Sequence, residues 1–238
     1  MQKITSDEEF SRLLIGLSND IIDSHIHYKI YKDLIKANNL NYQVMAQSNT
    51  FWSLTLKAHL ATSINLLCKV YDTHKSALHL TRFLQTIQDN LNLFGEANFR
   101  KRKQNNPFIN ELLKGHRSPD LQVLEADIHS CTKNDPLVKT LTILRGAVHA
   151  HRNAENTAKA NDISNIYPQS FEDFEKLLER SLTILNRYSH LYEASTYSTK
   201  AICHQDYNYI FKCIDSKLKN DELAIEKQLL ELKKLTEK

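Results

Sequence analysis

Apolar residues recur along much of the chain at spacings of three and four positions. In an α-helix this spacing puts side chains on one face, whereas a half-buried β-strand shows strict alternation. One run of this kind comprises Trp52, Leu56, Leu60, Ile64, Leu67 and Tyr71. A second comprises Ala77, Leu80, Leu84, Ile87 and Leu91, and a third comprises Leu137, Leu141, Leu144 and Val148. The pattern predicts amphipathic helices, and the sequence shows neither alternating strands and helices nor an internal repeat.

Residues that cap helices indicate where several of these elements begin. A serine followed three positions later by an acidic residue is typical of a capping box, and a capping side chain before proline places that proline at the first helical position. Such signals occur at Ser6 with Glu9, Ser118 with Pro119, Asp135 with Pro136, and Ser170 with Asp173. We expect the first of these helices to run towards Lys36 and the last to end at about Tyr192.

Polar stretches and glycines predict the connections between the helices. Gly95 offers a stop for the helix before it, and residues 98–107 are expected to form a loop. A short helix is expected from Pro107 to Gly115, and residues 153–167 form a polar stretch. Two further helices are expected at about residues 201–217 and 221–235.

Glycine and proline are scarce, with only four of each among 238 residues. A β-rich chain of this length would need many tight turns, so this scarcity favours long helices with few loops. The connections look too short to separate domains. We therefore expect an all-α protein, folded as a single-domain antiparallel helical bundle over residues 1–238 with additional helices at both termini.

Charge and cysteine usage narrow the class of protein further. The net charge of +3 is too small to demand or exclude a nucleic-acid partner. Cys68, Cys131, Cys203 and Cys213 are scattered without a C-x-x-C pair, which favours reduced thiols and a cytoplasmic location. The first residues do not resemble a signal peptide, and no stretch approaches the roughly 18 apolar residues of a transmembrane helix, so no membrane partner is expected.

One histidine segment resembles a metal-binding signature. Asp23, His25 and His27 have the D-x-H-x-H spacing of metal-dependent amidohydrolases. That signature requires a β-strand, on which alternate side chains point the same way. In a helix, side chains two positions apart diverge by about 200°. We therefore expect no metal site here and no cofactor elsewhere in the chain.

The densest concentration of polar chemistry lies between residues 144 and 153. Arg145, His149, His151 and Arg152 fall within eight residues at the end of a helix whose other side is apolar. Histidine transfers protons near neutral pH, and arginine binds phosphate or stabilises developing negative charge. Together they suit cleavage of a phosphodiester without a metal ion. The alternative is structural, because either histidine would also favourably cap the carbonyl groups at the helix C-terminus.

The same segment carries a family resemblance. Arg145 and His151 are separated by five residues in the sequence R-G-A-V-H-A-H-R, which resembles the R-x(4–6)-H motif of the HEPN superfamily of all-helical nucleotide-binding domains. Residues 51–82, including the stretch from Leu67 to Asp72, are similar to the abortive-infection U-type branch. The resemblance spans about residues 41–192, an HEPN-like core, and leaves about residues 201–236 as a C-terminal helical extension.

This resemblance implies a function and a set of catalytic residues. HEPN proteins are typically helical homodimers in which motif residues of both subunits meet in a cleft. Many are ribonucleases that require no metal and act in phage defence or in toxin–antitoxin systems. Arg145 matches the motif arginine and His151 the motif histidine, so the expected partners are RNA, a second copy of the chain and an antitoxin protein.

Two features of the motif leave alternatives open. The position after the arginine, commonly a polar residue such as asparagine in the family, is Gly146 here. The absence of a polar side chain at this position favours the alternative of a non-catalytic module that binds RNA, a nucleotide or a protein. On an ideal helix, His149 lies about 40° from Arg145 and His151 about 120° away. His149 is therefore the second candidate for the catalytic histidine.

A run of basic residues is the candidate RNA-binding segment. Arg100, Lys101, Arg102 and Lys103 fall in the predicted loop, and Arg152 lies next to the motif histidine. Basic side chains bind nucleic acid by neutralising phosphates and releasing counterions. A solvated loop is the simpler interpretation of the run. The sequence as a whole predicts a metal-independent endoribonuclease, with the binding module as its alternative.

Overall fold

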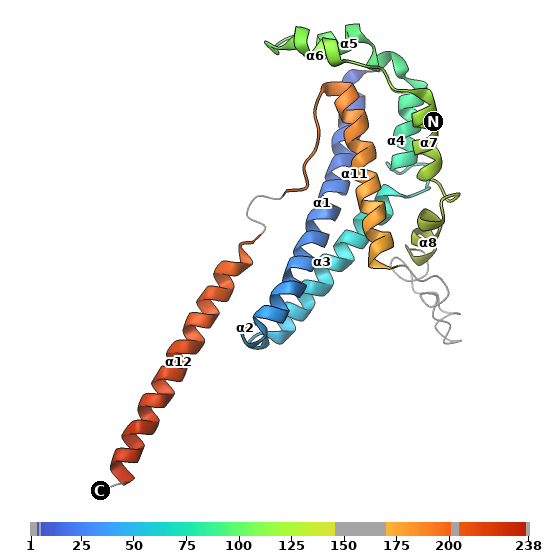
Figure 1. The fold of residues 1–238 in the computed structure, drawn as a ribbon. Helices are drawn as coiled ribbons and strands as arrows, with labels where there is room; N and C mark the ends of the chain where they lie inside the picture. The colour runs from blue at the N-terminus through green and yellow to red at the C-terminus, as the bar shows by residue number, and fades with distance from the viewer. Residues whose placement is uncertain (1–3, 5, 146–169, 201–204, 237–238) are drawn as a thin grey trace, which may run out of the picture. The chain divides into compact units, whose positions relative to one another are not determined.

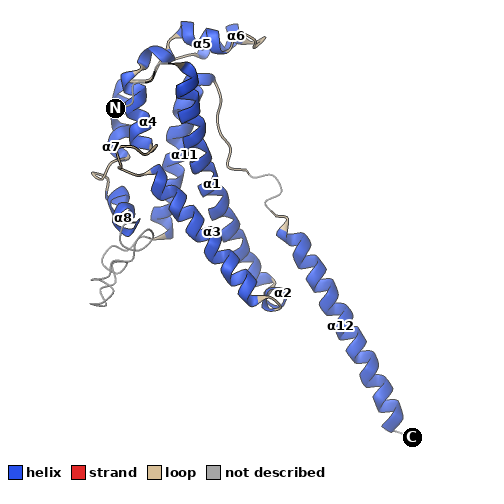
Figure 2. Ribbon diagram, turned by 180° about the vertical axis from the view of Figure 1, so that it is seen from behind, coloured by secondary structure: helices blue, strands red, loops and turns tan. Residues whose placement is uncertain are grey.

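The computed structural model describes residues 4, 6–145, 170–200 and 205–236. Within those ranges the regular structure is entirely helical, which confirms the all-α prediction (Figures 1 and 2). In chain order the helices are α1 (Asp7–Leu40), α2 (Tyr42–Ala46), α3 (Asn49–Val70), α4 (Leu80–Asp89), the 3₁₀ turn η1 (Leu91–Phe94), α5 (Glu96–Arg102), α6 (Ile109–Gly115), α7 (Leu121–Ser130), α8 (Pro136–Leu144), α11 (Phe171–Glu193) and α12 (Tyr207–Thr236).

The described residues form two compact units. The larger unit takes its residues from 1–28 and 61–199, and the smaller unit takes them from 29–60 and 200–238. Two of the three boundaries fall inside helices, within α1 and at the middle of α3, and the third falls between α11 and α12. The prediction of a single domain stays a prediction.

A cluster of buried aromatic rings forms part of the core of the larger unit. The Phe10 ring of α1 lies 5.3 Å from Phe83 of α4, 5.5 Å from Phe94 of η1 and 4.6 Å from Tyr192 of α11, measured between ring centroids. All four side chains are fully or almost fully buried. Aromatic pairs at these distances add to the stabilisation from area burial. Elements from three separate parts of the sequence, α1, the adjacent α4 and η1, and α11, are thereby joined around Phe10.

Two buried serines bring α1 and α3 together within this unit. Ser24 and Ser63 are both fully buried. The Ser24 hydroxyl donates to the Ser63 carbonyl at 2.8 Å, and the Ser63 hydroxyl donates to the Ser24 carbonyl at 2.7 Å. Small side chains permit a close approach of the helices, and the reciprocal bonds satisfy both hydroxyl groups.

The smaller unit has its own hydrophobic core. Its buried members are Leu34, Ala37, Val44, Met45, Trp52 and Phe211. The Trp52 and Phe211 rings meet edge to face at 5.2 Å. The first turns of α12 therefore pack on the hairpin formed by the end of α1, α2 and the start of α3.

Most helix starts agree with the capping signals. The amide of Glu9 donates to the Ser6 hydroxyl at 3.2 Å. Asp135 caps α8 with Pro136 at its first turn, and Ser170 forms a full capping box with Asp173. These predictions are confirmed because a cap depends only on residues within one helical turn.

Two local predictions between residues 98 and 120 were wrong. The predicted loop at 98–107 contains most of α5, because Phe99 is fully buried and the basic residues fall in the last turn, where positive charge suits the helix dipole. The cap of α7 is Asp120, which accepts from two backbone amides, and is not Ser118.

The two helices predicted at 201–217 and 221–235 are, over the described residues, one continuous helix, α12. Ion pairs four residues apart bridge the expected break, from Lys217 to Asp221 at 2.6 Å and from Lys219 to Asp215 at 2.8 Å. Pairs at this spacing each stabilise a helix modestly. Asp221, the first residue of the second expected helix, instead pairs with Lys217 inside one continuous helix.

Candidate functional site

Arg145, the predicted catalytic arginine, lies at the C-terminal end of α8 and is bound to an acidic residue. Its Nη1 lies 2.6 Å from Oδ1 of Asp72, which directly follows α3 and the turn at Tyr71. The Arg145 side chain is 35% exposed and that of Asp72 is 12% exposed. The pair is therefore sheltered on the Asp72 side and open to solvent on the Arg145 side.

Backbone groups hold the Asp72 carboxylate in place. Its Oδ1 accepts from the amide of Thr73 at 2.6 Å and from the amide of His74 at 3.1 Å. The preceding residue, Tyr71, is buried and donates its hydroxyl to the carbonyl of Leu177 in α11 at 2.9 Å. Asp72 is consequently fixed by the end of α3 and by its own loop, independently of Arg145.

The helix that carries Arg145 is also fixed at its start. Asp135 accepts from the amides of Leu137 and Val138 at 2.9 and 3.1 Å, which caps α8. The same carboxylate lies 2.9 Å from Nη1 of Arg180 in α11. Val138, Leu141 and Leu144 are buried. Because one acid both caps α8 and joins it to α11, the end of α8 reaches Asp72 in a defined orientation.

The environment fixes the protonation states around this pair. Desolvation raises the pKa of the Asp72 carboxyl group, but the hydrogen bonds from Arg145, Thr73 and His74 outweigh it, so the pKa lies below its usual value. Burial raises the pKa of the Cys68 thiol to about 12, which keeps this neighbour protonated. Burial also lowers the pKa of His79, whose Nδ1 accepts from the Arg82 amide to cap α4. At neutral pH the ion pair is thus flanked by a neutral thiol and a neutral imidazole.

The depressed pKa predicts how acid affects the fold. A carboxylate whose pKa is lower in the folded state than in the unfolded state stabilises the fold above the unfolded-state value of about 3.9, and this contribution is lost as pH falls through the folded-state value. We expect the unfolding temperature of wild type to drop more than that of Asp72→Asn between pH 6 and pH 2, because the variant has already lost the pair. Thermal unfolding followed by circular dichroism measures this difference, and parallel curves for the two proteins would contradict it.

The remaining predicted motif residues, Gly146, His149, His151 and Arg152, lie outside the described residues. Their roles stay predictions from the sequence.

The structure divides the basic run at 100–103 into two kinds of residue. The Arg102 side chain is only 11% exposed and lies 2.9 Å from Asp7. Its Nε donates to the Tyr192 carbonyl at 3.1 Å, and its guanidinium carbon lies 3.9 Å from the centre of the Tyr192 ring. Arg100 and Lys101 are exposed and Lys103 is half-buried. Arg102 therefore holds the fold together, which leaves the other three for the predicted contact with RNA.

The histidine segment near residue 25 lies in the middle of α1, as expected. His25 is half-buried, and its Nε2 lies 3.0 Å from the Leu178 carbonyl in α11. Desolvation lowers the pKa of His25. Over the described ranges, no three histidine, cysteine or acidic side chains are grouped so that they could hold a metal ion. None of the helices described is long and apolar enough to cross a membrane.

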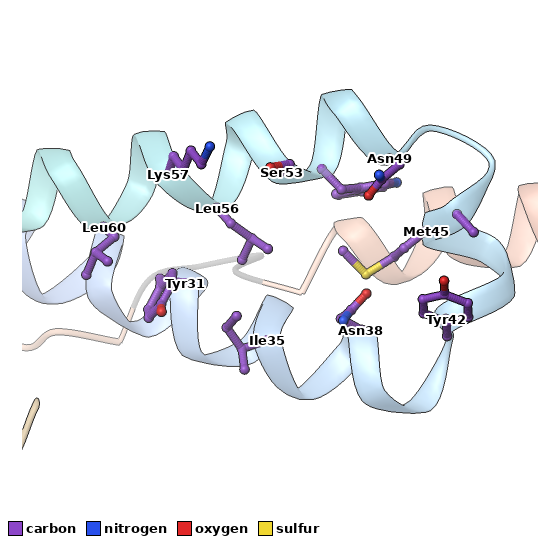
Figure 3. Close-up of a pocket in the computed structure, with 12 residues that line it drawn as sticks. Tyr31, Ile35, Asn38, Tyr42, Met45, Asn49, Ser53, Leu56, Lys57 and Leu60 are labelled. Carbon is purple, nitrogen blue, oxygen red and sulfur yellow. The ribbon is translucent and has the colours of Figure 1, made fainter.

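A pocket of about 580 Å³ lies in the smaller unit, away from the motif residues in the sequence. Figure 3 shows Tyr31, Ile35 and Asn38 of α1 facing Leu56 of α3 across it, with Met45 at one end. Lys57 is the one charged residue in its lining. With no acid–base pair and no arginine, this pocket lacks the groups required for phosphodiester chemistry, and Arg145 with Asp72 remains the better candidate site.

Comparison with known families identifies the family of the chain. The family model HEPN_AbiU2, described as AbiU2, matches residues 7–210. The chain belongs to the AbiU2 family of HEPN proteins. The match confirms the U-type branch suggested by the sequence, and it extends beyond residues 41–192 at both ends. Neither the curated proteins nor the solved structures gave a match to this AbiU2-family chain. Membership of this family suggests a role in abortive infection.

Sequence reasoning missed Asp72 as part of the site. This residue ended the stretch from Leu67 that resembled the U-type branch, yet nothing local connected it to Arg145. A weak signal was present, because an acidic residue directly after a buried helix end requires a partner. Within the AbiU2 match, the structure supplies that partner as the motif arginine.

Proposed function

We propose that this AbiU2-family protein is a metal-independent endoribonuclease that acts as a homodimer in abortive infection. The proposal rests on the ion pair and the partial exposure of Arg145. The arginine of the R-x(4–6)-H motif is held by Asp72 at 2.6 Å while about a third of its side chain stays exposed. An antitoxin that restrains the enzyme belongs to the same proposal.

The ion pair orients Arg145 without using all its donors. A guanidinium group has five N–H donors in a planar fork, and Asp72 engages Nη1. The carboxylate is itself held by two backbone amides, so Arg145 does not swing freely. A donor set fixed before the substrate arrives stabilises developing charge without the cost of reorganisation. The exposed edge of Arg145 is therefore suited to a phosphate oxygen.

The proposed reaction uses the 2′-hydroxyl of RNA as the nucleophile. One imidazole, from His151 or His149, removes the 2′-hydroxyl proton while the oxygen attacks phosphorus. The bond from phosphorus to the 5′-oxygen then breaks, and that oxygen takes a proton from an imidazolium, which leaves a 2′,3′-cyclic phosphate and a 5′-hydroxyl end. Arg145 stabilises the extra negative charge on the pentavalent phosphorus. Arg100, Lys101 and Lys103 would bind the RNA backbone electrostatically.

The test is cleavage of a mixed RNA pool by the purified protein in excess EDTA. We expect cleavage products with 2′,3′-cyclic phosphate ends and no cleavage of a matched oligonucleotide whose 2′-hydroxyls are all replaced by hydrogen. Activity that appears only with added magnesium, or products with 5′-phosphate ends, would contradict the mechanism.

The non-catalytic binding module is the second candidate, and one observation favours it. Asp72 already neutralises the charge of Arg145, and Gly146 provides no side chain to orient the motif. This candidate predicts that the protein binds RNA and the 2′-deoxy oligonucleotide equally and leaves both intact. Fluorescence anisotropy on the same two oligonucleotides separates binding without cleavage from the proposed nuclease.

A further inference from the structure

The C-terminal helix α12 is covered along only part of its length. It runs from Tyr207 to Thr236, and Phe211 is its one buried side chain among the residues described. Tyr207, Ile214 and Leu218 are partly buried against the core of the smaller unit. From residue 219 to residue 236 every side chain is exposed. More than half of this helix therefore extends past the core that anchors it.

The same apolar stripe continues along the exposed part. At 100° per residue, the stripe lies within a sector of about 60°. Its members are Tyr207, Phe211, Ile214, Leu218, Ile225, Leu229 and Leu232. The exposed fraction is 4% at Phe211 but 56% at Ile225, 54% at Leu229 and 59% at Leu232. The exposed part of the stripe is therefore an apolar surface of the kind that marks an interaction site.

Charged residues beside the exposed stripe indicate what covers it. Glu226 and Lys233 border the stripe on the same side, and Asp221 borders it on the other. In two antiparallel copies of α12 whose two-fold axis passes beside Leu229 and Leu230, Glu226 of each copy lies beside Lys233 of the other. In a parallel pair, Asp221 of one copy would instead lie beside Glu226 of the other, which is repulsive. The charges thus favour a second, antiparallel copy.

We propose that the exposed half of α12 is a self-association surface, on which a second copy of the chain packs its own α12 in the antiparallel sense. Such an interface is isologous, since the same patch is used twice and the assembly closes. It buries Ile225, Leu229 and Leu232 of both chains around the axis. The surface is in the smaller unit, whereas Arg145 and Asp72 are in the larger one, so the proposal stands apart from the nuclease mechanism.

The first test compares the mass of two matched double variants of the full chain. Leu229→Glu with Leu232→Glu places charge on the stripe. Leu223→Glu with Leu230→Glu places the same charge on residues that are as exposed, at 62% and 58%, but lie about 130° to 150° from the centre of the stripe around the helix. By light scattering at about 50 μM, we expect the stripe variant to have half the mass of wild type and the control to keep the wild-type mass.

This comparison holds whether or not the chain also pairs through another surface. With α12 as the single interface, the stripe variant changes a dimer into a monomer, and with a second interface it changes a tetramer into a dimer, so the mass is halved in both cases. Circular dichroism checks that both variants keep their helix content. Equal masses for the two variants, or a wild type that is monomeric, would overturn the proposal. In the second case another protein covers the stripe.

Orientation is tested by crosslinking between different chains. Single variants Glu226→Cys and Lys233→Cys are made in a background with Cys203 and Cys213 replaced by serine. A short bifunctional thiol reagent should link the two variants when they are mixed and link neither to itself. If each variant instead crosslinks to itself and the mixture shows no link between the two variants, the pair is parallel and the antiparallel assignment is overturned.

Discussion

Replacing Arg145 with alanine is expected to lower the rate constant for RNA cleavage by about 10²- to 10³-fold, the usual effect of removing one fixed donor to a charged transition state. The structure gives this residue a preset orientation through Asp72, so its loss removes both the donor and the geometry. Single-turnover cleavage in EDTA, with enzyme in excess, measures the chemical step. Arg145→Lys should recover only a small part of the rate, because lysine keeps the charge but lacks the planar fork.

Arg117→Ala is the matched control for the loss of an arginine. Arg117 is exposed, and its Nη1 donates to the nearby carbonyls of Lys114 and His116. We expect this variant to cleave at the wild-type rate. The proposed role of Arg145 would be wrong if Arg145→Ala, shown to be folded by urea unfolding, cleaved RNA within about threefold of wild type.

The second large effect concerns stability. Arg102→Met should lower the free energy of unfolding by up to about 3 to 5 kcal/mol, the range for breaking a buried ion pair by removing one partner, because the two side chains are 11% and 23% exposed. The change leaves the carboxylate of Asp7 without its cation and removes the packing on the Tyr192 ring. For a protein of this size each kcal/mol shifts the unfolding temperature by roughly 2–4 °C. Urea unfolding followed by circular dichroism measures the change directly.

Arg100→Met is the matched control within the same basic run. Its side chain is 54% exposed and lies 3.8 Å from Glu96, a surface pair of the kind that contributes little. We expect less than about 0.5 kcal/mol of change for this variant. Similar losses in the two variants would mean that the contacts of Arg102 do not carry the stability assigned to them.

The helices were largely predictable from the sequence, because their signals are local. Asp135 caps α8 through amides two and three positions later, so the sequence alone indicates where α8 begins. The predicted helix boundaries were wrong where tertiary contacts determine them. α5 forms where a loop was expected because its own residue Phe99 is buried, and no pattern within a single turn indicates that burial.

The candidate site was predictable only in part. Arg145 was identified by its motif, but its partner Asp72 lies far away in the sequence, and the contact depends on how α3 and α8 pack against α11. The basic run shows the same limit. Arg100 and Arg102 are the same residue type two positions apart, and only the fold distinguishes a solvated side chain from one that closes the core.

One helix, α11, contacts both of the elements that carry Asp72 and Arg145. Tyr71 beside Asp72 bonds to Leu177, and the cap of α8 is joined to Arg180, both in α11. α11 is translated after all the other helices described in the larger unit. A nascent chain that has not yet reached α11 therefore lacks the α11 contacts that fix the end of α3 and the start of α8. The order of synthesis thus delays assembly of the site until most of the protein has been made.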